Sequence, residues 1–171
     1  MANEQALTVA ALEAAIQIEI DGKEFYLKMS QGSGNAMGKK LFSSLAAEED
    51  LHRQKFEKIY KAVAAQKSWP EVKIERHIGE YKTIFAEASE SAQFTGSELE
   101  AVQTAMQMEN KTRDFYLGRS EKAHFPAEKK YYETLAKEER IHHTLLQDYY
   151  EYMQNPAQYF TIKEKHSLDG G

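Results

Sequence analysis

The chain has 171 residues, a formal net charge of −5 at neutral pH and no cysteine. A chain of this length can bury a sizeable core, so we expect residues 1–171 to form a single domain. The lack of cysteine excludes disulfides, thiol catalysis, iron–sulfur clusters and thiolate zinc sites.

Charge and hydropathy also limit which partners and which cellular location are expected for the protein. No run of basic residues stands out in the sequence, so we expect no nucleic-acid partner. No apolar stretch approaches the roughly eighteen residues of a membrane span, so no membrane partner is expected. Residues 1–12 lack the features of an export signal, and a reducing cytoplasm is the expected location.

The N-terminal half of the sequence predicts two helices. Apolar residues recur at helical spacing over residues 8–29, and Glu19 interrupts this apolar stripe. Glycine, serine and asparagine at 32–35 end the first helix. A second helix is expected at 36–66, where one face carries Phe42, Leu45, Glu49, His52 and Phe56.

The C-terminal half predicts two more helices after a long connection. Residues 67–96 are expected to form a crossover, within which 78–89 could form a short helix. Ser97 followed by Glu100 is typical of a capping box and begins a third helix at 97–119. Pro126 suits the first turn of a fourth helix at 126–153. The remaining tail, 154–171, carries aromatic residues that could pack back on the bundle.

The two predicted hairpins repeat each other at an offset of ninety residues. Residues 12–60 align with 102–150 without a gap, and the identities include glutamate, histidine and tyrosine. Solenoid repeats are shorter, at about 20–50 residues. We therefore predict an all-α four-helix bundle of two duplicated helical hairpins joined by a long crossover.

The repeat carries metal-ligand residue types. Each half has a lone glutamate on its first helix and a Glu-x-x-His motif on its second. The six residues are Glu19, Glu49, His52, Glu109, Glu139 and His142. A single Glu-x-x-His is usually solvated surface, but two in one register favour the set with which four-helix bundles hold two metal ions. Oxygen and imidazole ligands without sulfur favour iron or manganese.

Tyrosines accompany the lone glutamates. Tyr26 and Tyr116 follow Glu19 and Glu109 by two helical turns, so they lie on the same face. They are either core aromatics or phenols that donate hydrogen bonds to ligating carboxylates. The other histidines lack such spacing and are interpreted as incidental: His77, His124, His143 and His166.

A second acidic pair directly precedes two of the predicted ligands. Glu48 and Glu138 occupy equivalent positions of the repeat. Each is rotated by about 100° around the helix axis from the ligand that follows it. A metal-bound histidine needs an acceptor for its outer nitrogen. We expect Glu48 to accept from His142 and Glu138 to accept from His52. The alternative is that both carboxylates are solvated helix surface.

These residues resemble those of the ferritin-like superfamily, and within it the rubrerythrin di-iron domain. The resemblance covers residues 8–153 and puts the six glutamates and histidines at the family's ligand positions. Tyr26 and Tyr116 stand where ferritin-like proteins often carry a tyrosine near the metals. The resemblance implies a ferritin-like bundle with two iron ions, manganese or mixed metals being alternatives.

The sequence departs from the family in three places. Thr112 stands where rubrerythrins usually carry a further glutamate, which puts the ligand switching associated with that glutamate in doubt. The rubredoxin module of full rubrerythrins needs four cysteines, and this chain has none. Bacterioferritins bind haem through a methionine after the ligand of the second helix, where this chain has Asp50, so no haem is expected.

The resemblance implies a di-iron oxidoreductase of oxidative-stress defence, in which the six ligands are also the catalytic residues. Its substrate would be hydrogen peroxide or dioxygen. Its electrons would come from an external donor, such as a rubredoxin-like protein or another reductase. The alternatives are a ferroxidase or iron-handling protein of the ferritin type, and a non-catalytic metal-binding module.

Self-association is expected from the many tyrosines of the fourth helix. One bundle stripe is too narrow to bury all of them, and exposed aromatic patches usually mark contact surfaces. The residues are Tyr131, Tyr132, Tyr149, Tyr150 and Tyr152. A homodimer is the simplest expectation, with higher homo-oligomers as alternatives.

Overall fold

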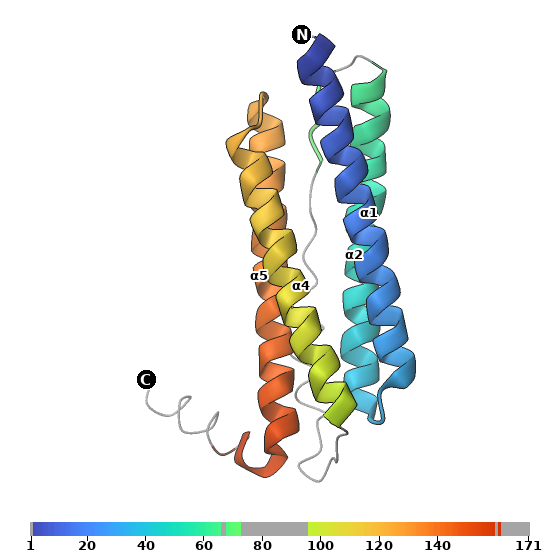
Figure 1. Ribbon diagram of the computed structural model, residues 1–171, viewed down its shortest axis with the longest axis vertical. Coiled ribbons are helices and arrows are strands. Elements are labelled where there is room, and N and C mark those ends of the chain that lie inside the picture. Colours follow the sequence, from blue (N-terminus) through green and yellow to red (C-terminus); the bar gives the residue numbers. More distant parts are fainter. Residues whose placement is uncertain (1, 66–67, 73–95, 160, 162–171) are drawn as a thin grey trace.

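The computed structural model describes residues 2–65, 68–72, 96–159 and 161. Four long helices dominate the described residues: α1 (Ala2–Gly32), α2 (Ala36–Ala64), α4 (Gly96–Glu121) and α5 (Pro126–Gln154). They run side by side as an elongated bundle (Figure 1). The all-α ferritin-like bundle predicted from the sequence is confirmed.

Local sequence signals explain where two of the helices begin. The side chain of Asn35 accepts a hydrogen bond from the Gly38 backbone N–H at 2.8 Å, and so caps α2. Pro126 occupies the first turn of α5, where its missing N–H costs no intrahelical bond. Helix α1 begins at Ala2, earlier than the expected residue 8. The short helix expected at 78–89 lies outside the described residues.

The helices pack as two hairpins. α1 lies mainly against α2, and α4 mainly against α5. Each end of the bundle has its own apolar cluster. One cluster includes Leu41, Phe42 and Tyr149, and the other includes Leu12, Phe56 and Leu135. The layer of the bundle between these two clusters contains the predicted ligand residues, so apolar packing closes it at both ends.

The tyrosines of α5 belong to the core. Tyr131, Tyr132, Tyr149 and Tyr152 are at most 4% exposed, and Tyr150 is half-buried. Two segments beyond the four helices help to cover them. The Trp69 ring centroid lies 5.7 Å from that of Tyr132, and the Tyr159 ring centroid lies 5.8 Å from that of Tyr152. The prediction of an exposed aromatic surface on α5 is therefore wrong. The expectation of a dimer now rests on the family resemblance alone.

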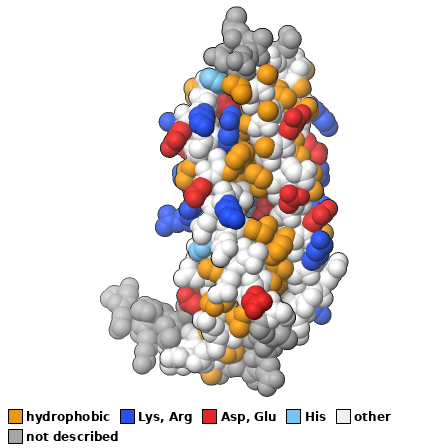
Figure 2. All heavy atoms as spheres, in the orientation of Figure 1, with side chains coloured by type: hydrophobic (Ala, Val, Ile, Leu, Met, Phe, Trp, Pro, Cys, Tyr) orange, Lys and Arg blue, Asp and Glu red, His pale blue; other side chains and the backbone are white. Residues whose placement is uncertain are grey.

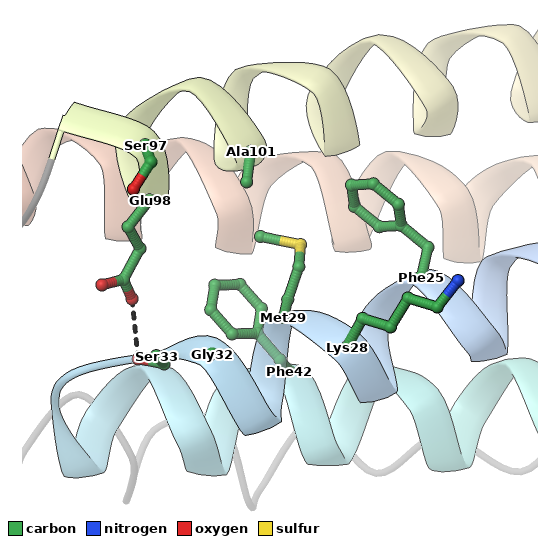
Figure 3. A pocket seen from close by; sticks show the side chains of 9 residues that line it. All are labelled: Phe25, Lys28, Met29, Gly32, Ser33, Phe42, Ser97, Glu98 and Ala101. Atoms are coloured by element: carbon green, nitrogen blue, oxygen red, sulfur yellow. Dashed lines mark hydrogen bonds between the residues drawn. The ribbon is translucent and has the colours of Figure 1, made fainter.

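A polar network joins the two hairpins at one end of the bundle. Asn35 Nδ2 donates to the Tyr149 hydroxyl at 2.7 Å, and that hydroxyl donates to Glu98 Oε1 at 2.9 Å. Ser33 Oγ also donates to Glu98 Oε1, at 2.7 Å. Figure 3 shows Glu98 reaching Ser33 beside a pocket of about 330 Å³. The turn between α1 and α2 is thereby tied to both α4 and α5.

Gly38 lies inside this network, and its replacement is expected to destabilise the fold. A Cβ at this position would overlap Ser33 Oγ and the Tyr149 hydroxyl, and both side chains are buried. We expect Gly38→Ala to lower the free energy of unfolding by about 2 kcal/mol, the usual range for overpacking. Urea denaturation followed by circular dichroism measures the change.

Gly118→Ala is the matched control for this substitution. Gly118 lies in α4, and a Cβ there would have nothing within 4 Å. Its replacement is expected to be neutral or stabilising by up to about 1 kcal/mol, because alanine favours helix over glycine. Equal stabilities for the two variants would contradict the close packing around Gly38.

Candidate metal centre

The structure brings the six predicted ligand residues together in the middle of the bundle. Glu19 comes from α1, Glu109 from α4, and each of α2 and α5 supplies its Glu-x-x-His pair. All six residues are at most 4% exposed. The i, i+3 spacing predicts a shared helix side, and both pairs face the bundle interior.

Two groups of side chains form within this set. One contains Glu19, Glu49, His52 and Glu139, and the other contains Glu49, Glu109, Glu139 and His142. Within each group, one nitrogen or oxygen atom from every residue lies within 4.8 Å of the others. Glu49 and Glu139 belong to both groups.

Each group is centred on a histidine Nδ1. His52 Nδ1 lies 3.5 Å from Glu19 Oε2, 3.7 Å from Glu49 Oε2 and 3.8 Å from Glu139 Oε1. His142 Nδ1 lies 3.3 Å from Glu49 Oε1, 3.7 Å from Glu109 Oε2 and 3.7 Å from Glu139 Oε2. The second group thus repeats the first, with Glu109 in place of Glu19.

Glu49 and Glu139 connect the two groups through their separate oxygens. Glu49 directs Oε2 toward His52 and Oε1 toward His142. Glu139 directs Oε1 toward His52 and Oε2 toward His142. The imidazole rings themselves are nearly parallel, with centroids 5.9 Å apart. Each of these two carboxylates would therefore offer one oxygen to an ion in either group.

Tyrosines hold the two remaining carboxylates from the opposite hairpin. The Tyr26 hydroxyl donates to Glu109 Oε1, and the Tyr116 hydroxyl donates to Glu19 Oε1. Each bond leaves the second oxygen directed at a histidine Nδ1. Burial and the neighbouring glutamate charges raise the pKa of both phenols well above the usual value, so they remain hydrogen-bond donors. Of the two readings of these tyrosines, the structure shows the hydrogen-bonded one.

The donor set fits a metal ion. Four of its atoms are buried without a hydrogen-bond partner: Glu19 Oε2, His52 Nδ1, Glu139 Oε1 and His142 Nδ1. Buried polar atoms are rarely left unpaired, and such exceptions need an explanation. Ligands bound at about 2.1 Å to one octahedral ion are separated by about 3–4 Å. The nitrogen–oxygen distances of both groups fall in that range.

In the metal-free protein, burial and the closely spaced glutamate charges determine the protonation of the cluster. Burial and the Glu49 charge raise the pKa of Glu19 to about 8. Burial and the charges of Glu49 and Glu109 raise the pKa of Glu139 well above its usual value. Burial opposes protonation of His52, but Glu19 and Glu49 outweigh it and raise the His52 pKa to about 9. The cluster therefore retains protons near neutral pH unless other positive charge neutralises it.

The contacts predicted for Glu48 and Glu138 differ from those observed. Both carboxylates are buried, at 6% and 3% exposure, so they are not solvated surface. However, His52 Nε2 is buried without a hydrogen-bond partner, so it does not donate to Glu138. Among the described residues, no hydrogen bond joins Glu48 to His142. The 100° rotation therefore predicts the burial of both glutamates, but not their hydrogen-bond partners.

The other two described histidines belong to neither group. His143 is half-buried beside His142, and His124 is exposed in the turn before α5. His77 and His166 lie outside the described residues.

One component of the site was missed by sequence reasoning. A pocket between α1 and α4 reaches Glu49, Glu109 and Glu139, and its lining includes Gly22 and Thr112. These last two positions are equivalent in the ninety-residue repeat. Only Thr112 attracted notice in the sequence, as a departure from a family pattern. The signal that could have revealed the opening is the small size of Gly22 on the ligand-bearing face.

A helical bundle whose core holds carboxylates and two imidazoles defines a ferritin-like metal-binding protein. A family model described as Rubrerythrin matches residues 10–150. The chain therefore belongs to the rubrerythrin family. No curated protein and no solved structure matches it significantly. None of the helices in the described part of the chain is long and apolar enough to cross a membrane.

Proposed function

We propose that this protein is a di-iron oxidoreductase that reduces hydrogen peroxide with electrons from an external donor. The observation that carries the proposal is the pair of carboxylates, Glu49 and Glu139, shared between two buried histidine-centred groups. A single ion that only stabilises the fold would need one such group. Two groups that share carboxylates suit a pair of ions that act together, and family membership supports iron as the metal.

In this proposal Glu19 and His52 would hold one ion and Glu109 and His142 the other, and Glu49 and Glu139 would contribute to both. Two ferrous ions, when bound, supply Lewis acidity and one electron each. Peroxide reduction consumes two electrons and two protons and gives two waters, so one electron per ion matches the demand. The external donor then restores both electrons, because the chain has no redox cysteine.

The protein's own residues position and shield the reacting centre. Tyr26 and Tyr116 each fix one carboxylate oxygen, so that the other keeps its direction toward the histidine of its group. The apolar clusters at both ends limit water and strengthen electrostatic interactions inside the site. The tyrosine protons remain on the phenols, which therefore continue to donate to the two carboxylates.

When the iron-loaded, reduced protein is mixed with hydrogen peroxide, we expect its ferrous iron to be oxidised faster than free ferrous iron. Stopped-flow absorbance should show rapid formation of ferric iron in the near ultraviolet. Because Thr112 replaces a family glutamate, we expect peroxide and dioxygen to be less sharply discriminated than in other rubrerythrins. Oxidation no faster than that of free ferrous iron would refute the peroxidase proposal. Iron uptake far beyond two ions per chain would instead indicate ferritin-type iron handling.

A further inference from the structure

The pocket between α1 and α4 connects the metal centre to the surface. It measures about 240 Å³, and its inner end is formed by the buried residues Tyr26, Glu49, Glu109 and Glu139. A water molecule in the liquid occupies about 30 Å³. The pocket is therefore much larger than hydrogen peroxide alone requires.

Polarity changes along the pocket. The inner end carries carboxylates and a phenol, whereas the walls nearer the surface include the half-buried Ile18 and Met108. Figure 2 shows hydrophobic side chains gathered along the junction of α1 and α4 on this face. An apolar wall in front of a polar floor suits a molecule with one apolar end and one polar end.

The rim of the pocket carries no excess of charge. The exposed residues Asp21 and Lys111 occupy equivalent positions of the two hairpins and have opposite signs. An entrance lined by one sign of charge would concentrate ions of the other sign. A balanced pair does not, so this rim favours a neutral molecule.

Gly22 and Thr112 line the pocket together with the carboxylates. A Cβ built on Gly22 would lie 3.5 Å from Cγ and Cδ of Glu49, at ordinary van der Waals contact. One methyl group therefore fits there, but it takes up space over the carboxylate. Thr112 is the equivalent residue of the other hairpin and is half-buried.

We propose that this pocket binds small neutral alkyl hydroperoxides, and that Gly22 and Thr112 set the largest alkyl group it admits. The peroxide end faces the carboxylates, and the alkyl group lies between Ile18 and Met108. Reduction breaks the O–O bond of ROOH and consumes two electrons and two protons, giving ROH and water. The electrons come from the reduced iron pair, one from each ion, so this inference rests on the proposed function.

The first experiment compares tert-butyl hydroperoxide with hydrogen peroxide on the iron-loaded, reduced protein. The unmodified protein is expected to be oxidised by both. In Thr112→Leu and Gly22→Ala the rate with tert-butyl hydroperoxide should fall on the order of tenfold, since an added methyl or methylene in a pocket is worth about that much. The rate with tert-butyl hydroperoxide should fall more than the rate with hydrogen peroxide, and Gly118→Ala should change neither rate. Iron content is measured for each variant.

The second experiment detects binding without any reaction. Dialysed protein loaded with manganese(II) should speed the proton relaxation of tert-butanol, the alcohol product, because the pocket holds it beside the paramagnetic ion. Zinc-loaded protein gives the diamagnetic baseline. The enhancement should drop in Thr112→Leu and persist in Gly118→Ala.

The outcomes separate this inference from the proposed function. Equal slowing of both peroxides in Thr112→Leu, or tert-butanol relaxation unaffected by that substitution, would overturn the pocket assignment. A protein inert to hydrogen peroxide that still relaxes tert-butanol in a Thr112-dependent manner supports the pocket and overturns only the peroxidase proposal.

Discussion

Replacing Glu49 with alanine is expected to abolish binding of both metal ions, whereas replacing Glu19 is expected to abolish one. Glu49 directs a different oxygen at each histidine, so both groups lose a ligand when it is removed. Glu19 belongs to the His52 group alone. Metal analysis of dialysed protein loaded with ferrous iron or manganese should give two ions per chain for the unmodified protein.

Glu109→Ala provides the symmetric test of this prediction. It should spare the His52 group and disable the His142 group, which leaves one ion bound as in Glu19→Ala. Glu13→Ala is the control, because Glu13 is an exposed residue of α1 outside both groups. Two ions retained in Glu49→Ala would show that the shared carboxylate is not a ligand.

Metal binding is expected to stabilise the fold strongly. The ligand set spans both hairpins, and ions that bind only the folded chain shift the unfolding equilibrium. At a free metal concentration about a thousandfold above the dissociation constant the gain is about 4 kcal/mol. For a domain of this size that corresponds to a rise in melting temperature of roughly 8–16 °C. Calorimetry with and without manganese(II) measures it.

Glu139→Gln is expected to preserve or raise the melting temperature of the metal-free protein and to lower that of the metal-loaded protein. The amide removes a buried, crowded acidic group, so the metal-free variant should melt at the same or a higher temperature than the metal-free unmodified protein. Its response to manganese should largely disappear. A variant that loses stability without metal and keeps the full metal response would indicate a structural role for Glu139 instead.

Periodicity and the repeat predicted the fold and the six clustered residues because both depend on local spacing. Helical spacing decides which residues share a face, and the ninety-residue register decides which faces correspond. Spacing could not show that Tyr26 reaches Glu109 across the hairpins, because that contact depends on how the halves pack. It also placed Glu48 near His142, although a rotation angle alone does not set the distance between two side chains.

The tyrosines of α5 show a second limit of patterns within one helix. Part of this tyrosine set was expected on the surface because a single stripe is too narrow to bury all five residues. Trp69 and Tyr159, which lie beyond the four helices, pack against Tyr132 and Tyr152. Contacts from residues outside a helix leave no periodic signal within it, and so they became visible only in the folded chain.

The division of the ligands between two similar hairpins has an evolutionary consequence. One hairpin alone supplies three of the four residues of one group and one of the four residues of the other, so an unfused ancestor could build the centre only as a pair of identical chains. In such a pair every substitution appears twice. Fusion into one chain removes that constraint, and the two halves can then specialise separately. Gly22 opposite Thr112, and Asp21 opposite Lys111, are differences that an identical pair could not have carried.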